Sequence, residues 1–161
     1  MVTKSLFFLL FVAVDMLELF DGPVPVEDLL IQWYRDEANS NYGAFIPFIG
    51  TIRDEDGISG LSFDIYEPIL EAWFEAWQVK AKEAGAVLKM AHSRGDVPLH
   101  TSSYVAAVFS PKRKVALKMI NDFVEDFKAS APIWKYDLKE GNRLYAADRS
   151  TPISGSGILG E

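Results

Sequence analysis

The chain has 161 residues, 49% apolar and 24% charged, so it is long enough for one sizeable core and too short for two ordinary domains. Its net charge of −7 argues against sequence-independent binding to nucleic acid or to an anionic membrane, because both depend on positive charge. It contains no cysteine, which excludes disulfides, thiolate metal sites and a cysteine nucleophile. We therefore expect neither a nucleic-acid nor a membrane partner, and the absence of cysteine is compatible with a reducing compartment such as the cytoplasm.

Residues 1–15 are expected to be an apolar N-terminal extension. Lys4 precedes an apolar run over 6–14, which has the charge and length of an export-signal core. The run is too short to span a bilayer, which needs about 20 apolar residues, and no clear cleavage site follows it. A buried strand is one alternative. A start codon placed too early, with Met16 as the true beginning, is another.

Apolar periodicity and turn residues predict alternating strands and helices from residue 16 onward. One helix is expected over 26–37, where apolar residues recur at one-face spacing. A second is expected over 69–84 and ends at Gly85. The expected strands cover 16–20, 43–52, 58–66, 86–91, 103–109, 133–138 and 143–147.

Two of these strands carry further signals. The run over 43–52 is almost continuously apolar, which predicts a strand covered on both faces, whereas Pro47 indicates an edge or a bulge. Gly95 and Pro98 are expected in the connection between the two strands at 86–91 and 103–109. No linker or repeat interrupts the pattern. The sequence therefore predicts a single α/β (α+β) domain over 16–149, followed by a flexible Ser/Gly/Pro-rich tail over 150–161.

Basic residues are concentrated in one part of this acidic chain. Residues 89–118 contain six basic side chains and one acidic one, which indicates a discrete anionic ligand rather than a polymer. Within this stretch Ser110 is expected to be the N-cap of a helix that has Pro111 at its first position and continues to residue 128. Lys112 and Arg113 then lie at the helix N-terminus, where free N–H groups and the dipole favour anions. A solvated first turn is the alternative.

A pair of lysines flanks the end of this helix. Lys128 closes the helix, Pro132 reverses the chain, and Lys135 stands on the following strand, so both ammonium groups could reach one pocket. Two close cations lower the pKa of one of them and together bind an anion. Alternatively, Lys128 complements the helix dipole and Lys135 is a solvated strand residue.

Arg53 and His92 are weaker candidates. Arg53 follows an apolar strand that ends in Gly-Thr-x-Arg, a position suited to binding carboxylate or phosphate, although pairing with Asp54 or Glu55 is the alternative. His92 is more typical of a hydrogen-bonded structural histidine than of a catalytic one. With two histidines and no cysteine, no metal site is expected.

The order and spacing of these motifs resemble the catalytic (large) subunits of molybdopterin synthase, the MoaE family. The resemblance covers 16–149. It implies an α/β hammerhead fold with helices packed on a mixed or antiparallel sheet. The matching motifs are residues 43–45 (GAF), 48–54 (FIGTIRD), 61–71 (LSFDIYEPILE), 110–113 (SPKR) and 131–135 (APIWK).

The resemblance also implies an activity and partners. In this family a central homodimer of large subunits binds a small ubiquitin-like subunit at each end, giving a heterotetramer. The small subunit carries a thiocarboxylate on its C-terminal Gly-Gly and donates the sulfur to cyclic pyranopterin monophosphate. Two such transfers build the dithiolene of molybdopterin. This sulfurtransferase reaction of molybdenum cofactor biosynthesis implies no cofactor of its own.

By position, Lys128 and Lys135 match the essential lysines of the family. Arg53, Arg113, Lys112 and Arg149 correspond to substrate-binding positions, with Arg113 expected to serve the pocket of the neighbouring subunit. Phe48 corresponds to an aromatic residue of the pocket wall.

Two departures favour an alternative function. Lys112 stands where the family usually has His, which removes a group that titrates near neutrality. In residues 92–95 (HSRG) the arginine is displaced by one position, and on a strand this moves Arg94 to the other face unless a bulge compensates. The alternative is a non-catalytic scaffold that binds a ubiquitin-like sulfur carrier, although retention of both lysines argues against it. An unrelated anion-binding domain is a third possibility.

Overall fold

The computed structural model describes residues 16–146, which contain three helices and seven strands. The predictions for residues 1–15, for Arg149 and for the tail 150–161 lie outside this range. The helices are α2 (Val26–Asp36), α3 (Glu67–Glu83) and α4 (Arg113–Ser130). The strands are β1 (Leu17–Asp21), β2 (Ala44–Thr51), β3 (Gly60–Ile65), β4 (Val87–Pro98), β5 (Ser102–Ser110), β6 (Ile133–Lys139) and β7 (Asn142–Tyr145).

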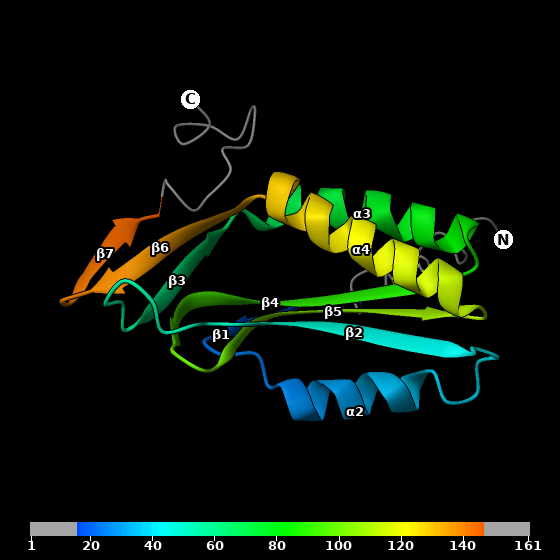
Figure 1. Cartoon of the computed structure of the whole chain (residues 1–161). Coiled ribbons are helices and arrows are strands. Elements are labelled where there is room, and N and C mark those ends of the chain that lie inside the picture. The colour runs from blue at the N-terminus through cyan, green and yellow to red at the C-terminus, as the bar shows by residue number, and fades with distance from the viewer. Residues whose placement is uncertain (1–15, 147–161) are drawn as a thin grey trace, which may run out of the picture.

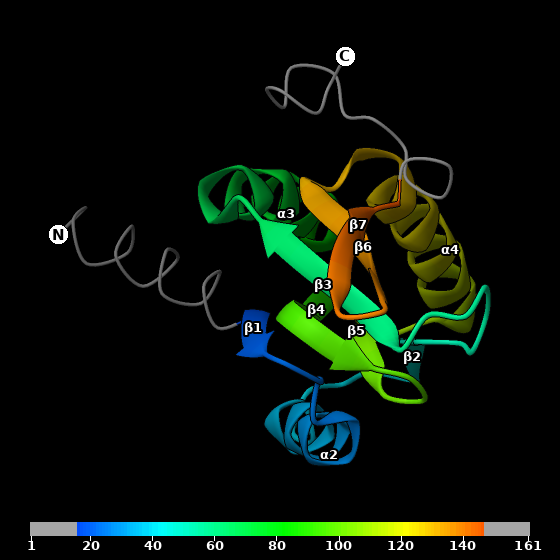
Figure 2. The same cartoon turned by 90° about the vertical axis from the view of Figure 1, so that its left-hand side faces the viewer.

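All seven strands belong to one sheet, with the order β2-β5-β4-β3-β6-β7. β1 pairs with β4 in parallel, and the other pairings are antiparallel, so the predicted mixed α+β architecture is confirmed. Helices α3 and α4 lie side by side on one face of the sheet, and α2 covers the other (Figures 1 and 2). None of the helices in the described residues is long and apolar enough to cross a membrane.

Strand β5 is the centre of the core, and all nine of its residues are buried. Successive side chains of a strand point to opposite faces, so β5 contributes to two separate clusters. Tyr104, Ala106 and Val108 pack against α3 and α4, whereas Val105 and Ala107 pack against α2.

Strand β2 differs from its prediction. Residues 47–49 are exposed, so the expectation of a strand covered on both faces is wrong. Within the described residues β2 pairs with β5 alone, which makes it an edge strand. The signal from Pro47 was therefore the correct one, because an edge strand tolerates a residue without an N–H group.

Strand β4 continues through the expected connection to Pro98, so placing Gly95 and Pro98 in a loop was wrong. Residues 87–92 pair with β5, and residues 95–98 pair with β3. Gly95 has a φ of +71° at the point where the strand changes partner. Glycine adopts this conformation without steric cost, so the residue that suggested a turn allows a bend within one long strand.

The start of α4 also differs from its prediction. The helix begins at Arg113 with Lys112 as N-cap, whereas Ser110 is the last residue of β5. The Gly43 N–H donates to the Ser110 carbonyl at 3.1 Å, which keeps Ser110 in the sheet. The Ser110 hydroxyl instead accepts from the Lys112 N–H at 3.3 Å.

Candidate functional site

The chain reversal after α4 places Lys128 and Lys135 at the same end of the sheet. Two residues, Ala131 and Pro132, separate α4 from β6, and the Ala131 N–H donates to the Phe127 carbonyl at 3.1 Å. Lys128 lies in the last turn of α4. Ile133, on β6, packs into the core. Residues two apart on a strand point to the same face, so Lys135 lies on the same inward face as Ile133. The two lysines therefore follow one another around a short, buried turn.

An aromatic cluster extends beside this turn. We define it as five rings from five different elements: Phe48, Phe63, His92, Tyr104 and Phe127. Phe127 stacks on Tyr104 with ring centroids 4.0 Å apart, and Tyr104 contacts Phe48 at 5.7 Å. His92 contacts Phe127 at 5.5 Å and meets the edge of Phe63 at 4.9 Å.

The aromatic cluster lies beside Lys135 and reaches the surface at Phe48. Phe127 precedes Lys128 in the chain, and Phe63 is the cross-strand partner of Lys135. Phe48, at the other end of the cluster, is 39% exposed. The arrangement gives Lys135 a wall of low polarity, beside which electrostatic interactions are stronger than in water, whereas Lys128 is exposed at the end of α4.

The polar groups of the aromatic cluster are electrically neutral. His92 is 2% exposed, and its burial lowers its pKa to about 4. Its Nδ1 lies 2.8 Å from the Ser93 carbonyl oxygen, so Nδ1 carries the proton and donates it in this hydrogen bond. Burial raises the pKa of Tyr104 well above 10. The Tyr104 hydroxyl is buried and has no hydrogen-bond partner among the described residues.

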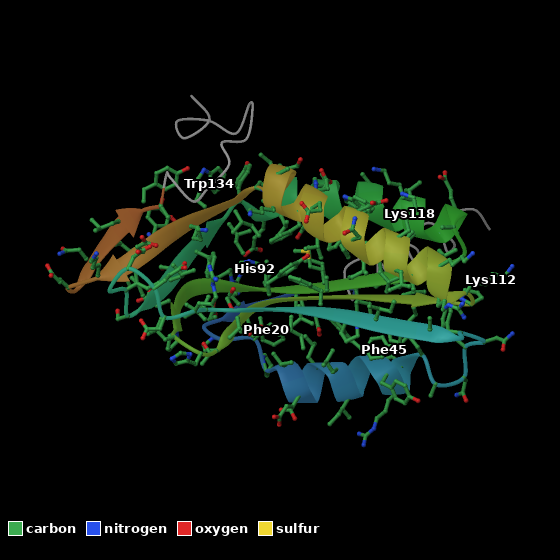
Figure 3. The ribbon with its side chains drawn as sticks, in the orientation of Figure 1. Phe20, Phe45, His92, Lys112, Lys118 and Trp134 are labelled. Carbon is green, nitrogen blue, oxygen red and sulfur yellow. The ribbon has the colours of Figure 1, made fainter. Side chains whose placement is uncertain are left out.

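Arg53 is paired with a neighbouring carboxylate, and the N-terminus of α4 lies apart from Lys128. The Arg53 side chain is 81% exposed and forms an ion pair with Glu55 at 2.9 Å, which matches the alternative foreseen for it. Lys112 and Arg113 are exposed at the start of α4. Fifteen residues of helix separate Arg113 from Lys128, a length of about 22 Å. Figure 3 shows Lys112 beside one end of α4 and Trp134, the neighbour of Lys135, beyond the other end.

Arg94, the displaced arginine, is held by acidic side chains. Its guanidinium donates to Asp21 at 3.1 Å and makes a second, shorter contact with Glu67 at the start of α3. These two carboxylates join β1, β4 and α3. Arg94 is therefore engaged in a structural ion pair in the single chain.

The sequence analysis missed part of this environment. It assigned no role in the site to Phe127, Tyr104 or Phe63. Their contribution depends on contacts between strands far apart in the chain, and a period-two pattern does not identify the strand that lies opposite. Within residues 16–146 no group of three or more His, Cys, Asp or Glu side chains could hold a metal ion.

Comparison with known proteins shows the family. The model of the MoaE protein family matches residues 21–130. The molybdopterin synthase catalytic subunit of Helicobacter pylori (strain ATCC 700392 / 26695) is 49% identical over 144 residues, covering 89% of this chain and 99% of that protein. The Bacillus subtilis molybdopterin synthase catalytic subunit is 26% identical over 84% of this chain and 87% of its own length. The chain belongs to the MoaE family, and the resemblance noted from its motifs is confirmed.

Solved structures agree with this assignment. A chain in the complex of subunits 1 and 2 of molybdopterin-converting factor from Helicobacter pylori 26695 superimposes with a TM-score of 0.85 at 49% identity. That match covers 89% of this chain and 99% of the solved one. Molybdopterin synthase from Staphylococcus aureus gives a TM-score of 0.69 at 25% identity, over 80% and 94% of the two chains.

Proposed function

We propose that this chain is the catalytic subunit of a molybdopterin synthase. It accepts sulfur from the thiocarboxylated C-terminus of a small ubiquitin-like subunit and transfers it to cyclic pyranopterin monophosphate. The observation that carries the proposal is the placement of Lys128 and Lys135 around one short turn beside the aromatic cluster. The 49% identity to a catalytic subunit of that name supports it.

The residue types suit this reaction. The chain has no cysteine, so it cannot carry a persulfide, and the sulfur must arrive on a partner. In each transfer a carbon–sulfur bond replaces a carbon–oxygen bond of the pterin, whose oxygen leaves. Water then hydrolyses the acyl–sulfur bond of the carrier, which leaves a carboxylate on the carrier and the sulfur on the pterin. Cations beside a wall of low polarity stabilise the substrate phosphate and the negative charge that develops during the attack. One lysine of the pair can also act as general acid or base.

We infer that the site is completed by a second copy of the chain. About 22 Å of helix separates Arg113 from Lys128, so the two cannot contact the same small substrate within one chain. In a homodimer Arg113 and Lys112 of one subunit can extend to the pocket of the other. Arg53 and Phe48 contribute from the subunit that provides Lys128. The cysteine-free composition suits a reducing compartment, and we assign the reaction to the cytoplasm.

The second candidate function is a non-catalytic scaffold that binds the sulfur carrier. The observation in its favour is the engagement of Arg94 with Asp21 and Glu67, which occupies a cation that would otherwise be available to an anionic substrate.

Reconstitution separates the two functions. This chain, a thiocarboxylated small subunit and cyclic pyranopterin monophosphate are mixed, and molybdopterin is measured. We expect product from the wild type and a loss of at least about 100-fold in Lys128→Ala. Lys118→Ala is the matched control, because Lys118 is an exposed lysine of the same helix whose ion pair is with Asp122. A wild-type complex that forms but gives no product would favour the scaffold.

A further inference from the structure

An acidic side chain lies near the C-terminal end of α4, where the helix dipole disfavours it. Asp126 is four residues from the end of the helix at Ser130. The C-terminal end of a helix carries partial negative charge, so a carboxylate there is unfavourable unless other groups compensate. Residues that break a local rule of this kind are frequently tied to function.

Three donors compensate the Asp126 carboxylate. The Trp77 indole N–H donates to Oδ2 at 2.7 Å, and the Trp73 indole N–H donates to the same oxygen at 3.2 Å. The Ser130 hydroxyl donates to Oδ1 at 2.9 Å. Trp73 and Trp77 lie one turn apart on α3, so this carboxylate joins the last turn of α4 both to the neighbouring helix and to its own terminus.

The side chain next to Asp126 is fixed as well. Successive residues of a helix are rotated by about 100°, so Asp126, Phe127 and Lys128 point in three different directions. Asp126 faces α3, and Phe127 faces the sheet, where it stacks on Tyr104 at 4.0 Å. Lys128, about 200° from Asp126, is directed away from α3. Because helix ends otherwise fray, these two contacts hold the backbone of the last turn, from which the exposed Lys128 side chain extends.

We propose that Asp126 is a positioning residue for Lys128, acting through the last turn of α4 and without contact to the substrate. The inference rests on the proposed function, because it takes Lys128 as the reacting lysine. It predicts that the hydrogen bonds accepted by Asp126, more than its charge, are what the reaction requires.

Two variants at this position separate hydrogen bonding from charge. Asp126→Asn keeps a carbonyl oxygen for both indoles and an amide group for the Ser130 hydroxyl, whereas Asp126→Leu has a similar shape and no polar atom. In the reconstituted complex, well below the unfolding midpoint of every variant, we expect Asp126→Asn to stay within about threefold of the wild-type kcat. Asp126→Leu is expected to lose at least about tenfold in kcat while KM changes less than about twofold.

A second readout does not depend on turnover. Amide hydrogen exchange over residues 127–131 is expected to be faster in Asp126→Leu and unchanged in Asp126→Asn. Asp122→Leu is the matched control, because it removes an exposed carboxylate one turn earlier on α4 and should change neither readout. If Asp126→Leu does not fold, the double variant Trp73→Phe/Trp77→Phe removes both indole donors and keeps an aromatic ring at each position.

Three outcomes would overturn the inference: wild-type kcat in folded Asp126→Leu, unchanged exchange at the end of its α4, or equal losses in the Asn and Leu variants. A wild-type complex that makes no product would contradict the proposed function instead. In that case the exchange measurement still tests whether Asp126 holds the end of α4.

Discussion

At the scale of single residues, the Tyr104 hydroxyl is the clearest unexplained feature of the aromatic cluster. It is buried with no hydrogen-bond partner among the described residues, and such a group costs about 1–3 kcal/mol. Tyr104→Phe keeps the stacked ring and removes this cost. We therefore expect the free energy of unfolding, measured in urea, to rise by about 1 kcal/mol. A loss of similar size would show that the hydroxyl does have a partner in solution.

His92 is expected to make stability depend on pH. Its pKa is about 4 in the folded protein and 6.5 in the unfolded chain, so between these values the unfolded chain binds more protons. The free energy of unfolding therefore falls as the pH is lowered from 6.5 towards 4, by about 3 kcal/mol in full.

Denaturation in urea across this pH range measures the His92 effect. His92→Asn keeps a donor for the Ser93 carbonyl and should flatten the dependence on pH. His100→Asn is the matched control. His100 is exposed, and asparagine readily adopts its φ of +63°. If the free energy of unfolding depends on pH equally in the wild type and in His92→Asn, other titrating groups cause the dependence.

At the scale of elements, the junction of β3 with β4 has no space for a side chain at Gly60. A Cβ at this position would lie 2.4 Å from the Val97 carbonyl oxygen, which is backbone and cannot move aside alone. We expect Gly60→Ala to lower the free energy of unfolding by about 1–3 kcal/mol, as overpacking does. Gly85→Asn is the control, because nothing lies within 4 Å of a Cβ at Gly85 and asparagine tolerates its φ of +71°. Equal effects of the two substitutions would contradict this explanation.

Most elements were predictable from the sequence, and the exceptions share a cause. The helices α2 and α3 follow from local periodicity, and β6 and β7 correspond to the strands expected over 133–138 and 143–147. The misplaced features are the continuation of β4 past Gly95 and the start of α4 after Ser110. In both places the sheet determines the conformation: β4 exchanges one partner strand for another, and Gly43 pairs with Ser110. A pattern along one segment contains no information about the strand that will pair with it.

At the scale of the whole molecule, the sequence predicted how some of the candidate site residues are placed relative to one another, but not how all of them could form one site. The spacing around Pro132 was enough to bring Lys128 and Lys135 to one end of the sheet. Arg113 and Lys128 lie near the two ends of α4. A straight helix keeps its ends apart, so these two residues cannot meet within one chain. We therefore proposed that a second subunit brings the two together. A sequence read as one chain does not show where that subunit lies.

Mixing two inactive variants tests this arrangement. Lys128→Ala and Arg113→Ala are each expected to lose activity in their own homodimers. In a mixed dimer one site combines both substitutions, and the other combines the intact Lys128 of one subunit with the intact Arg113 of its partner.

If subunits exchange at random, half of the dimers are mixed and each has one intact site. Molybdopterin formation should then return to about a quarter of the wild-type rate per site. If Arg113 instead served the site of its own chain, each site of a mixed dimer would contain one substitution and activity would stay at the level of the single variants. Lys118→Ala mixed with Lys128→Ala is the reference, because Lys118 has no role in either arrangement. Half of the sites in that mixture are intact whether or not subunits exchange, so it should give about half of the wild-type rate per site. Recovery in the first mixture would therefore demonstrate that each active site is built from two copies of the chain.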